Sequence, residues 1–397
     1  MKSAAFRPLR RCLCLLLLLG CLAGCRAPAA TPESSVPLPP AAGDAQAAGS
    51  NEELRGVWLS YLELEPLLQD ADPAAAEARL TAVMDTCAAA GINTVFFHAR
   101  AHSDAFYAST VYPPAAAAAA LLQQGFDPLA CAVEAAHARG LSLHAWVNPY
   151  RIGEDSSRAA TQAENAVFCQ EGIWYYNPGC PAARQLVLDG VRELLQNYAI
   201  DGIHFDDYFY PAGLRATGET FEAIPAGTDV GDWRRNQVDG LISAVYGLAH
   251  QSGRVFGVSP IALPEKCRTT AYADVAAWMR QPGYIDYICP QIYFGFENTA
   301  SPFAGNLAMW AALPRRTGVR LYIGLALYKA GLPNDPYAGG GQAEWAQHSD
   351  ILARQVAALR AGGQADGFVL FRYAQLAAPD AAAAAELQNL LPLMQDE

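Results

Sequence analysis

This 397-residue sequence lacks several motifs that define common enzyme classes. It has no G-x-S-x-G elbow, which argues against a Ser/His/Asp hydrolase of that type. Leu59-Ser60-Tyr61 follows the first apolar segment in place of a glycine-rich turn, which disfavours an open nucleotide-binding sheet. The cysteines after Cys25 show no C-x-x-C metal spacing. Cys169 and Cys180 flank one stretch of chain, so a disulfide between them stays open outside the cytoplasm.

Basic residues are scarce, because 27 Lys and Arg stand against 39 Asp and Glu. Removing residues 1–24 would take away four basic residues and no acidic ones, which moves the formal net charge from −12 to −16. A surface of this sign repels phosphate backbones. We therefore expect no nucleic-acid partner.

The N-terminal segment has the pattern of a secretory signal peptide. Four basic residues precede the apolar run Cys12 to Leu19, which is too short to span a membrane. The segment ends in Leu22-Ala23-Gly24-Cys25, which looks like a bacterial lipobox. We expect residues 1–24 to be a lipoprotein signal peptide and Cys25 to carry the lipid. The Ala-, Pro- and Ser-rich residues 25–51 then form a flexible tether, and the protein is extracytoplasmic and anchored to a bacterial membrane.

From residue 52 onward, short apolar segments alternate with helical patterns. The predicted strands are 55–62, 93–101, 141–148, 202–205, 255–260, 285–293, 321–328 and 367–371. Eight strand–helix units predict a closed (β/α)8 TIM barrel, an α/β fold, as a single catalytic domain over residues 52–397. An open doubly wound sheet is the alternative. Residues 151–180 are predicted to form a long loop of functional importance.

The central stretch is Asp201-Gly-Ile-His-Phe-Asp-Asp-Tyr-Phe-Tyr-Pro211. It reads as a buried strand that becomes acidic and aromatic at its C-terminal end, where TIM-barrel enzymes hold their active sites. Strict alternation along a strand would place His204, Asp206 and Tyr208 on one face. Asp207 would then point to the other face.

Polar and aromatic residues also gather at the C-terminal ends of the other predicted strands. Aromatic rings cover the flat apolar faces of sugars, while polar side chains bond the hydroxyl groups. We therefore expect a polysaccharide substrate and no cofactor. The expected substrate-binding residues are Trp58, His98, Arg100, His144, Trp146, Asn148, His204, Tyr208, Gln291, Tyr293 and Arg372.

Glycosidic cleavage needs a positioned acid and a carboxylate that stabilises an oxocarbenium-like transition state. Asp206 is the predicted stabiliser or nucleophile, because it shares the inward face with His204. Asp207 either bonds structural groups or, if the strand has already turned, serves as the acid/base. Glu297, after the sixth strand, is the other acid/base candidate.

Several motifs resemble the glycosyl hydrolase-like 10 family. They are Arg55-Gly-Val-Trp58, Gly91-Ile-Asn-Thr-Val-Phe-Phe-His98, Trp146-Val-Asn-Pro-Tyr-Arg151, the central stretch, Gly257-Val-Ser-Pro260, Asp286-Tyr-Ile-Cys-Pro-Gln-Ile-Tyr293 and Gly324-Leu-Ala-Leu-Tyr-Lys329. The resemblance implies a secreted or lipoprotein barrel hydrolase acting on glycans. Family members are associated with the cell wall, including cleavage of peptidoglycan strands that have lost their stem peptides.

A more distant similarity is to chitinase-type barrels, whose fourth strand reads D-G-x-D-x-D-x-E. Here His204 replaces the middle aspartate, and Tyr208 stands where the acid glutamate would be. This departure leaves the proton donor unassigned.

Two alternatives to a glycosidase remain at this point. The first is a glycan-binding barrel that has lost catalysis, which the tyrosine at position 208 favours. The second is a metal-dependent deacetylase, with ligands drawn from His98, His102, His144, His204 and Asp206. The pattern carries no prediction of the oligomeric state.

Overall fold

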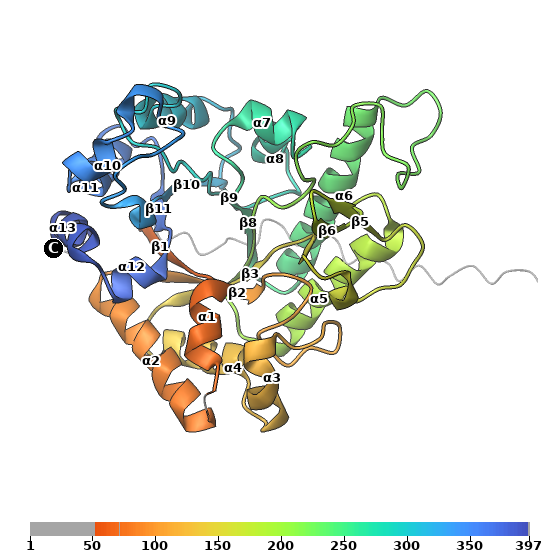
Figure 1. The fold of residues 1–397 in the computed structure, drawn as a ribbon, viewed down its shortest axis with the longest axis horizontal. Helices are drawn as coiled ribbons and strands as arrows, with labels where there is room; N and C mark the ends of the chain where they lie inside the picture. The colour runs from red at the N-terminus through yellow and green to blue at the C-terminus, as the bar shows by residue number, and fades with distance from the viewer. Residues whose placement is uncertain (1–51, 71, 396–397) are drawn as a thin grey trace, which may run out of the picture. The chain divides into compact units, whose positions relative to one another are not determined.

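The computed structural model describes residues 52–70 and 72–395. The predictions on the signal peptide, on Cys25 and on the tether lie outside these residues. Eight parallel strands close a barrel (Figure 1). Their order around it is β1 (Leu54–Leu59), β11 (Gly367–Leu370), β10 (Arg320–Leu325), β9 (Tyr287–Ile288), β8 (Val255–Val258), β7 (Gly202–Phe205), β3 (Ser142–Val147) and β2 (Thr94–Arg100). The predicted TIM barrel is therefore confirmed, and the open-sheet alternative is wrong.

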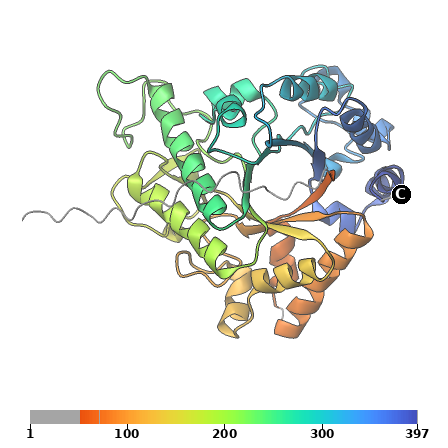
Figure 2. The ribbon, with the colours of Figure 1, turned by 180° about the vertical axis from the view of Figure 1, so that it is seen from behind.

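Helices surround the ring of strands, as the view from behind shows (Figure 2). They are α1 (Tyr61–Leu68), α2 (Pro73–Ala89), α3 (Ala116–Gln123), α4 (Pro128–His137), α5 (Pro181–Asn197), α6 (Val230–Gln251), α7 (Pro264–Thr269), α8 (Val275–Arg280), α9 (Phe303–Ala311), α10 (Glu344–Gln347), α11 (Ile351–Ala361), α12 (Tyr373–Ala377) and α13 (Ala381–Leu390). The sequence pattern did not predict α1. Its signal is a capping box, in which Ser60 and Glu63 satisfy each other's backbone N–H groups.

Residues 151–180 are not the structureless loop that was predicted. They form an antiparallel sheet of β4 (Arg151–Gly153), β6 (Ile173–Tyr176) and β5 (Val167–Gln170). Glu171 and Gly172, between β5 and β6, both have positive φ angles, 51° and 84°. This is the backbone of a two-residue hairpin turn whose twist suits the flanking strands.

The disulfide between Cys169 and Cys180 is absent, since both are free thiols. Cys169 is exposed on β5 and pairs in register with Trp174. Cys180 caps the start of α5, and its Sγ lies 3.9 Å from the carbonyl oxygen of Glu164.

Large rings occupy much of the barrel interior. Trp58, Phe96, Trp146 and Tyr287 form one buried cluster there. Glycines on neighbouring strands make room for them: a Cβ at Gly257 would lie 2.2 Å from the ring of Tyr287. The interior is thus a packed core that forms a floor beneath the C-terminal rim.

The rim itself is shaped by strands that end early. β9 covers only Tyr287–Ile288, although a strand was predicted over 285–293, because Pro290 cannot donate to the ladder. β7 ends at Phe205, directly before the two aspartates. Within the described residues, no helix is both long and apolar enough to cross a membrane.

Candidate active site

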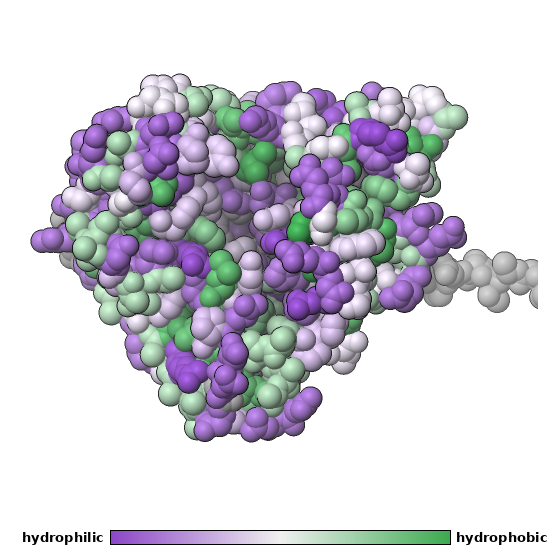
Figure 3. All heavy atoms as spheres, in the orientation of Figure 1, coloured by the Kyte–Doolittle hydropathy of each residue, from purple (hydrophilic) through white to green (hydrophobic). Residues whose placement is uncertain are grey.

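A pocket of about 280 Å³ opens at the C-terminal ends of the barrel strands. Figure 3 shows this face of the molecule, where the surface is hollowed near the middle of the view. The pocket is lined by Trp58, Ser60, Tyr61, Leu62, His98, Trp146, Asn148, Arg151, Asp206, Asp207, Tyr208, Ser259, Gln291, Tyr293 and Phe371. Nine of the predicted site residues are among them.

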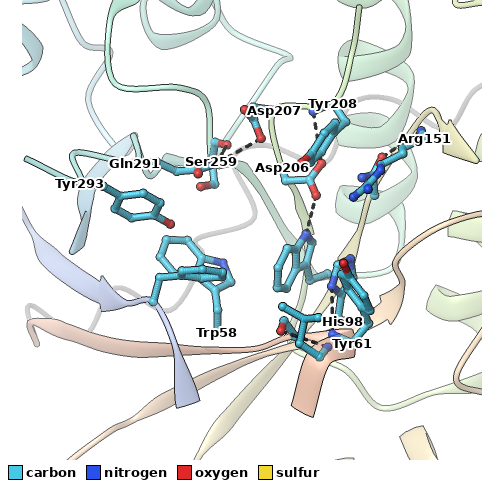
Figure 4. Close-up of a pocket in the computed structure, with 15 residues that line it drawn as sticks. Trp58, Tyr61, His98, Arg151, Asp206, Asp207, Tyr208, Ser259, Gln291 and Tyr293 are labelled. Carbon is cyan, nitrogen blue, oxygen red and sulfur yellow. Dashed lines mark hydrogen bonds between the residues drawn. The ribbon is translucent and has the colours of Figure 1, made fainter. Parts of the chain in front are cut away.

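Asp206 and Asp207 both reach this pocket, and we call them the carboxyl pair (Figure 4). Asp206 is 4% exposed, and its Oδ2 accepts a hydrogen bond from the Trp146 indole at 3.0 Å. Its Oδ1 accepts from the backbone N–H of Tyr208 at 3.3 Å. Asp207 is less buried, and its Oδ1 accepts from the Gln291 side chain at 3.3 Å.

Strict alternation predicted that Asp207 would point away from Asp206, and this prediction is wrong. β7 ends at Phe205, so the chain has left the strand before the pair begins. The structure shows the other possibility that the sequence left open for Asp207, in which the chain has already turned out of the strand. The two adjacent carboxyl groups can therefore act on one substrate.

Burial raises the pKa of both members of the carboxyl pair. For Asp206, burial and then the charge of Asp207 raise the pKa to about 8, opposed by the hydrogen bond from Trp146. Burial also raises the pKa of Asp207, opposed by hydrogen bonds, including one from Gln291, and by the charge of Arg151. Like charges this close disfavour double ionisation, so the pair keeps one proton at neutral pH. An acid and a carboxylate are then available together.

A stacked pair of rings supports the carboxyl pair from below. The His98 and Trp146 rings lie 3.5 Å apart between centroids and only 9° from parallel. His98 Nδ1 accepts from the backbone N–H of Tyr61 at 3.4 Å, so its proton is on Nε2. Burial lowers the pKa of His98 well below its ordinary value, which keeps the ring neutral. The stack fixes the indole that holds Asp206.

His144 and His204 were predicted to bind substrate, but they lie beneath the pocket, inside the barrel. Trp58 donates its indole N–H to His204 Nε2 at 3.1 Å, and His204 Nδ1 lies 3.0 Å from the hydroxyl oxygen of Tyr287. The same hydroxyl lies 2.9 Å from His144 Nδ1. We call these four residues the interior network.

The hydrogen bonds of the interior network fix its protons. Because His204 Nε2 accepts from Trp58, its Nδ1 must carry the proton and donate to Tyr287. The Tyr287 hydroxyl is then free to donate to His144. Burial lowers the pKa of His144 to about 4 and that of His204 well below its ordinary value. Both rings are neutral.

Three other predicted site residues are also kept out of the pocket. Arg100 is fully buried and donates to the carbonyl oxygens of Asn148 and Pro149, because β2 has a register irregularity between His98 and Arg100 that turns it outward. Arg372 forms an ion pair with Glu63 at 2.8 Å.

Glu297 is the third. Its half-exposed side chain pairs with His348 at 3.2 Å and does not line the pocket. The backbone at this position is held by Glu344, whose carboxylate accepts hydrogen bonds from the N–H groups of Phe296 and Glu297. Glu297 is therefore not placed to act together with the carboxyl pair.

Six lining residues were not among the predicted site residues: Ser60, Tyr61, Leu62, Arg151, Ser259 and Phe371. Ser60, Ser259 and Phe371 each stand directly after the end of a barrel strand, where TIM barrels place their functional residues. Tyr61 and Leu62 belong to the unpredicted α1. Arg151 was part of a recognised motif. The direction of its side chain could not be predicted from strand alternation, because Pro149 interrupts the strand pattern before it.

No group of three His, Cys, Asp or Glu side chains in the described part of the chain is arranged to hold a metal ion. The histidines proposed as ligands are instead divided between the pocket and the barrel interior beneath it. His98 stacks on Trp146, His102 meets the edge of Tyr61 at 4.9 Å, and His144 and His204 belong to the interior network.

Known proteins share this architecture. A family model described as glycosyl hydrolase-like 10 matches residues 53–339. Glycosyl hydrolase DigH of Escherichia coli K12 is 31% identical over 396 residues, covering 86% of this chain and 89% of that protein. Glycosyl hydrolase YngK of Bacillus subtilis strain 168 is 31% identical over 326 residues, covering 73% of this chain and 63% of that protein. The PgaB (BpsB) glycoside hydrolase domain of Bordetella bronchiseptica aligns with a TM-score of 0.56 at 16% identity, over 85% of this chain and 99% of that one, which is a likeness of fold.

Proposed function

The chain belongs to the glycosyl hydrolase-like 10 family and is a glycoside hydrolase, and on this premise we propose that it cleaves peptidoglycan strands that have lost their stem peptides. The observation that carries the proposal is the carboxyl pair, which stands in a pocket walled by aromatic rings. The rings of Trp58, Trp146 and Tyr293 line this pocket and are suited to the apolar faces of pyranose rings, and the polar side chains between them are suited to the hydroxyl groups.

The reaction needs one proton donor and one stabilising carboxylate. The pair shares one proton, and burial raises the pKa of both members. Asp207 is the more exposed of the two, so we assign to it the delivery of this shared proton to the leaving glycosidic oxygen as the C1–O bond breaks, which leaves Asp206 ionised. Asp206 is held by two N–H donors and stabilises the positive charge that develops at the anomeric carbon. A water then adds to that carbon and returns its proton to the pair.

This assignment supplies the donor that the tyrosine at position 208 cannot. Chitinase-type barrels carry a glutamate there, whereas here the carboxyl group comes from the preceding residue, Asp207. The inactive binding barrel was favoured by a missing acid, and Asp207 in the pocket removes that reason.

A digestion tests the proposal. The full-length protein in mild detergent would be incubated with intact peptidoglycan, with strands stripped of peptides and with chito-oligosaccharides, and products would be read by mass spectrometry. We expect fragments from stripped strands and none from the Asp207→Asn variant. Intact binding with no cleavage of any substrate would instead support the binding barrel.

We further propose that Cys25 is lipidated and that the enzyme works outside the cytoplasm, tethered to a bacterial membrane. The support is the signal-like N-terminus and its lipobox-like Leu22-Ala23-Gly24-Cys25. Wild-type protein should label with a fatty-acid analogue and sediment with membranes, whereas Cys25→Ser should do neither. Labelling of both proteins would refute the assignment.

A further inference from the structure

One cation in the pocket has no acidic partner in the described part of the chain. Arg151 is the only Arg or Lys among the lining residues, and no carboxylate there forms an ion pair with its guanidinium. The neighbouring Arg158, by contrast, pairs with Asp104 at 3.2 Å. An arginine whose charge is left unpaired beside a substrate pocket is available to an anion on the substrate.

Specific contacts hold Arg151 in its position beside the pocket. Its backbone N–H donates to the buried Asn148 side chain at 3.0 Å, and β4 pairs it in register with Tyr175. Its guanidinium lies over the ring of Tyr208, 5.1 Å from the centroid (Figure 4). Tyr208, which stands where chitinase-type barrels carry an acid, thus supports a cation at the mouth of the pocket.

The surroundings of Arg151 would repel an anion without it. Asp206 and Asp207 line the same pocket, and the described part of the chain is rich in acidic residues. A neutral sugar needs no cation, since hydroxyl groups are bound well by amides and neutral rings. A guanidinium makes two parallel hydrogen bonds to a carboxylate, which adds geometric selectivity to the charge.

We propose that Arg151 binds a carboxylate carried by the substrate sugar and thereby selects an acidic glycan. This inference rests on the proposed function. In peptidoglycan the lactyl carboxylate of the muramic residue is free only after the stem peptide is removed, because an amide bond otherwise masks it. Arg151 is then the residue that distinguishes stripped strands from peptide-bearing ones.

Arg151 also has a second effect that the experiment must separate. Its charge lowers the pKa of Asp206 and of Asp207, so its loss disturbs the carboxyl pair whatever the substrate. That disturbance acts equally on charged and neutral glycans. Recognition of a carboxylate acts only on charged ones, so the ratio of the two activities isolates it.

The experiment compares two matched substrates: stripped strands with free lactyl carboxylates, and the same strands with these groups converted to methyl amides. Wild-type protein should show a higher kcat/KM on the free acid by roughly tenfold to a hundredfold, as a charge-assisted hydrogen bond predicts. Arg151→Gln should lose most of this preference, and Arg151→Lys should keep part of it. Arg158→Gln, on the same stretch of chain, should retain the wild-type ratio.

Binding gives a readout that does not depend on turnover. In the Asp206→Asn background, calorimetry should show tighter binding of the free-acid strands than of the methyl amides, and Arg151→Gln should abolish the difference. Added salt should weaken only the free-acid binding. An unchanged ratio in Arg151→Gln, in turnover or in binding, would overturn the inference. Binding selectivity without cleavage by wild-type protein would overturn the proposed hydrolysis and leave the role of Arg151 standing.

Discussion

The barrel carries polar residues in its interior and at its C-terminal rim. The two groups differ in how many of their donors and acceptors already have a hydrogen-bond partner. In the interior network, a single chain of hydrogen bonds joins Trp58, His204, Tyr287 and His144. At the rim, the buried Ser259 hydroxyl and His98 Nε2 have no hydrogen-bond partner within the described residues. Arg151 has no acidic partner there either.

The difference distinguishes the polar residues that line the pocket from those that lie beneath it. Both groups come from the same strands, since His204 and Asp206 are two residues apart on β7 and its continuation. Spare hydrogen-bonding capacity points to a ligand only where the group also lines the pocket, because the buried hydroxyl groups of Tyr107 and Tyr150 lack partners too and lie outside it. Burial alone does not distinguish them, because His204 is 0% and Asp206 4% exposed.

The largest expected effect lies at the rim. Asp207→Asn should lower kcat/KM on stripped strands by at least about 100-fold, since it removes a transferable proton without changing the shape of the side chain. Its unfolding midpoint in urea should stay close to that of wild type. Asp201→Asn is the matched control, because Asp201 belongs to the same stretch but accepts from Leu143 N and pairs with His137. If the kcat/KM of Asp207→Asn stayed within threefold of wild type, the carboxyl pair at the rim would not be the catalytic group.

The interior network should show the opposite behaviour. Tyr287→Phe leaves the Nδ1 atoms of His204 and His144 without a partner, which should cost about 1–3 kcal/mol of unfolding free energy. The kcat/KM of the folded protein should change by only a few-fold, since Tyr287 does not line the pocket.

Tyr322→Phe is the control for that variant. The Tyr322 ring packs 5.2 Å from Tyr287, and within the described residues its hydroxyl makes no hydrogen bond. Its unfolding free energy should lie within about 0.5 kcal/mol of wild type. Equal losses in the two variants would mean that ring packing, and not the hydrogen-bond chain, sets the cost.

The carboxyl pair should also lower stability as pH rises. Burial raises the folded-state pKa of Asp206 to about 8, above its unfolded value, so the folded protein holds this proton more tightly. The resulting contribution favours folding at low pH and is lost as pH rises through the folded pKa. Wild-type protein should therefore lose more unfolding free energy between pH 5 and pH 8 than Asp206→Asn does, as measured by urea unfolding. If the unfolding free energies of the two proteins changed equally with pH, the ionised carboxyl pair would be better solvated than its burial indicates.

The smallest effect is expected away from both groups. Glu297→Gln removes a half-exposed ion pair with His348, so kcat/KM should stay within about twofold and stability within about 0.5 kcal/mol. A loss of activity comparable to that of Asp207→Asn would return Glu297 to the acid/base role that its position after the sixth strand first suggested.

The barrel followed from local pattern, because alternating apolar strands and capped helices leave few architectures that bury both. The same pattern placed Trp58, Trp146, Asp206 and Gln291 at one rim, since parallel strands align their C-terminal ends. Alternation failed for Asp207, because it holds only while the strand lasts, and β7 lasts four residues.

Tertiary structure alone decided which polar residues face a ligand. The sequence pattern ranked Arg100, His144, His204 and Arg372 with the pocket residues, since each alternates correctly at a strand end. A register irregularity turns Arg100 outward, and the interior glycines make room for His144 and for Tyr287, which bridges it to His204. Arg151 became visible only once β4 paired with β6 and set it over Tyr208. Residue type and spacing determine what a side chain can bond, but only the packed fold determines which of those bonds are already taken.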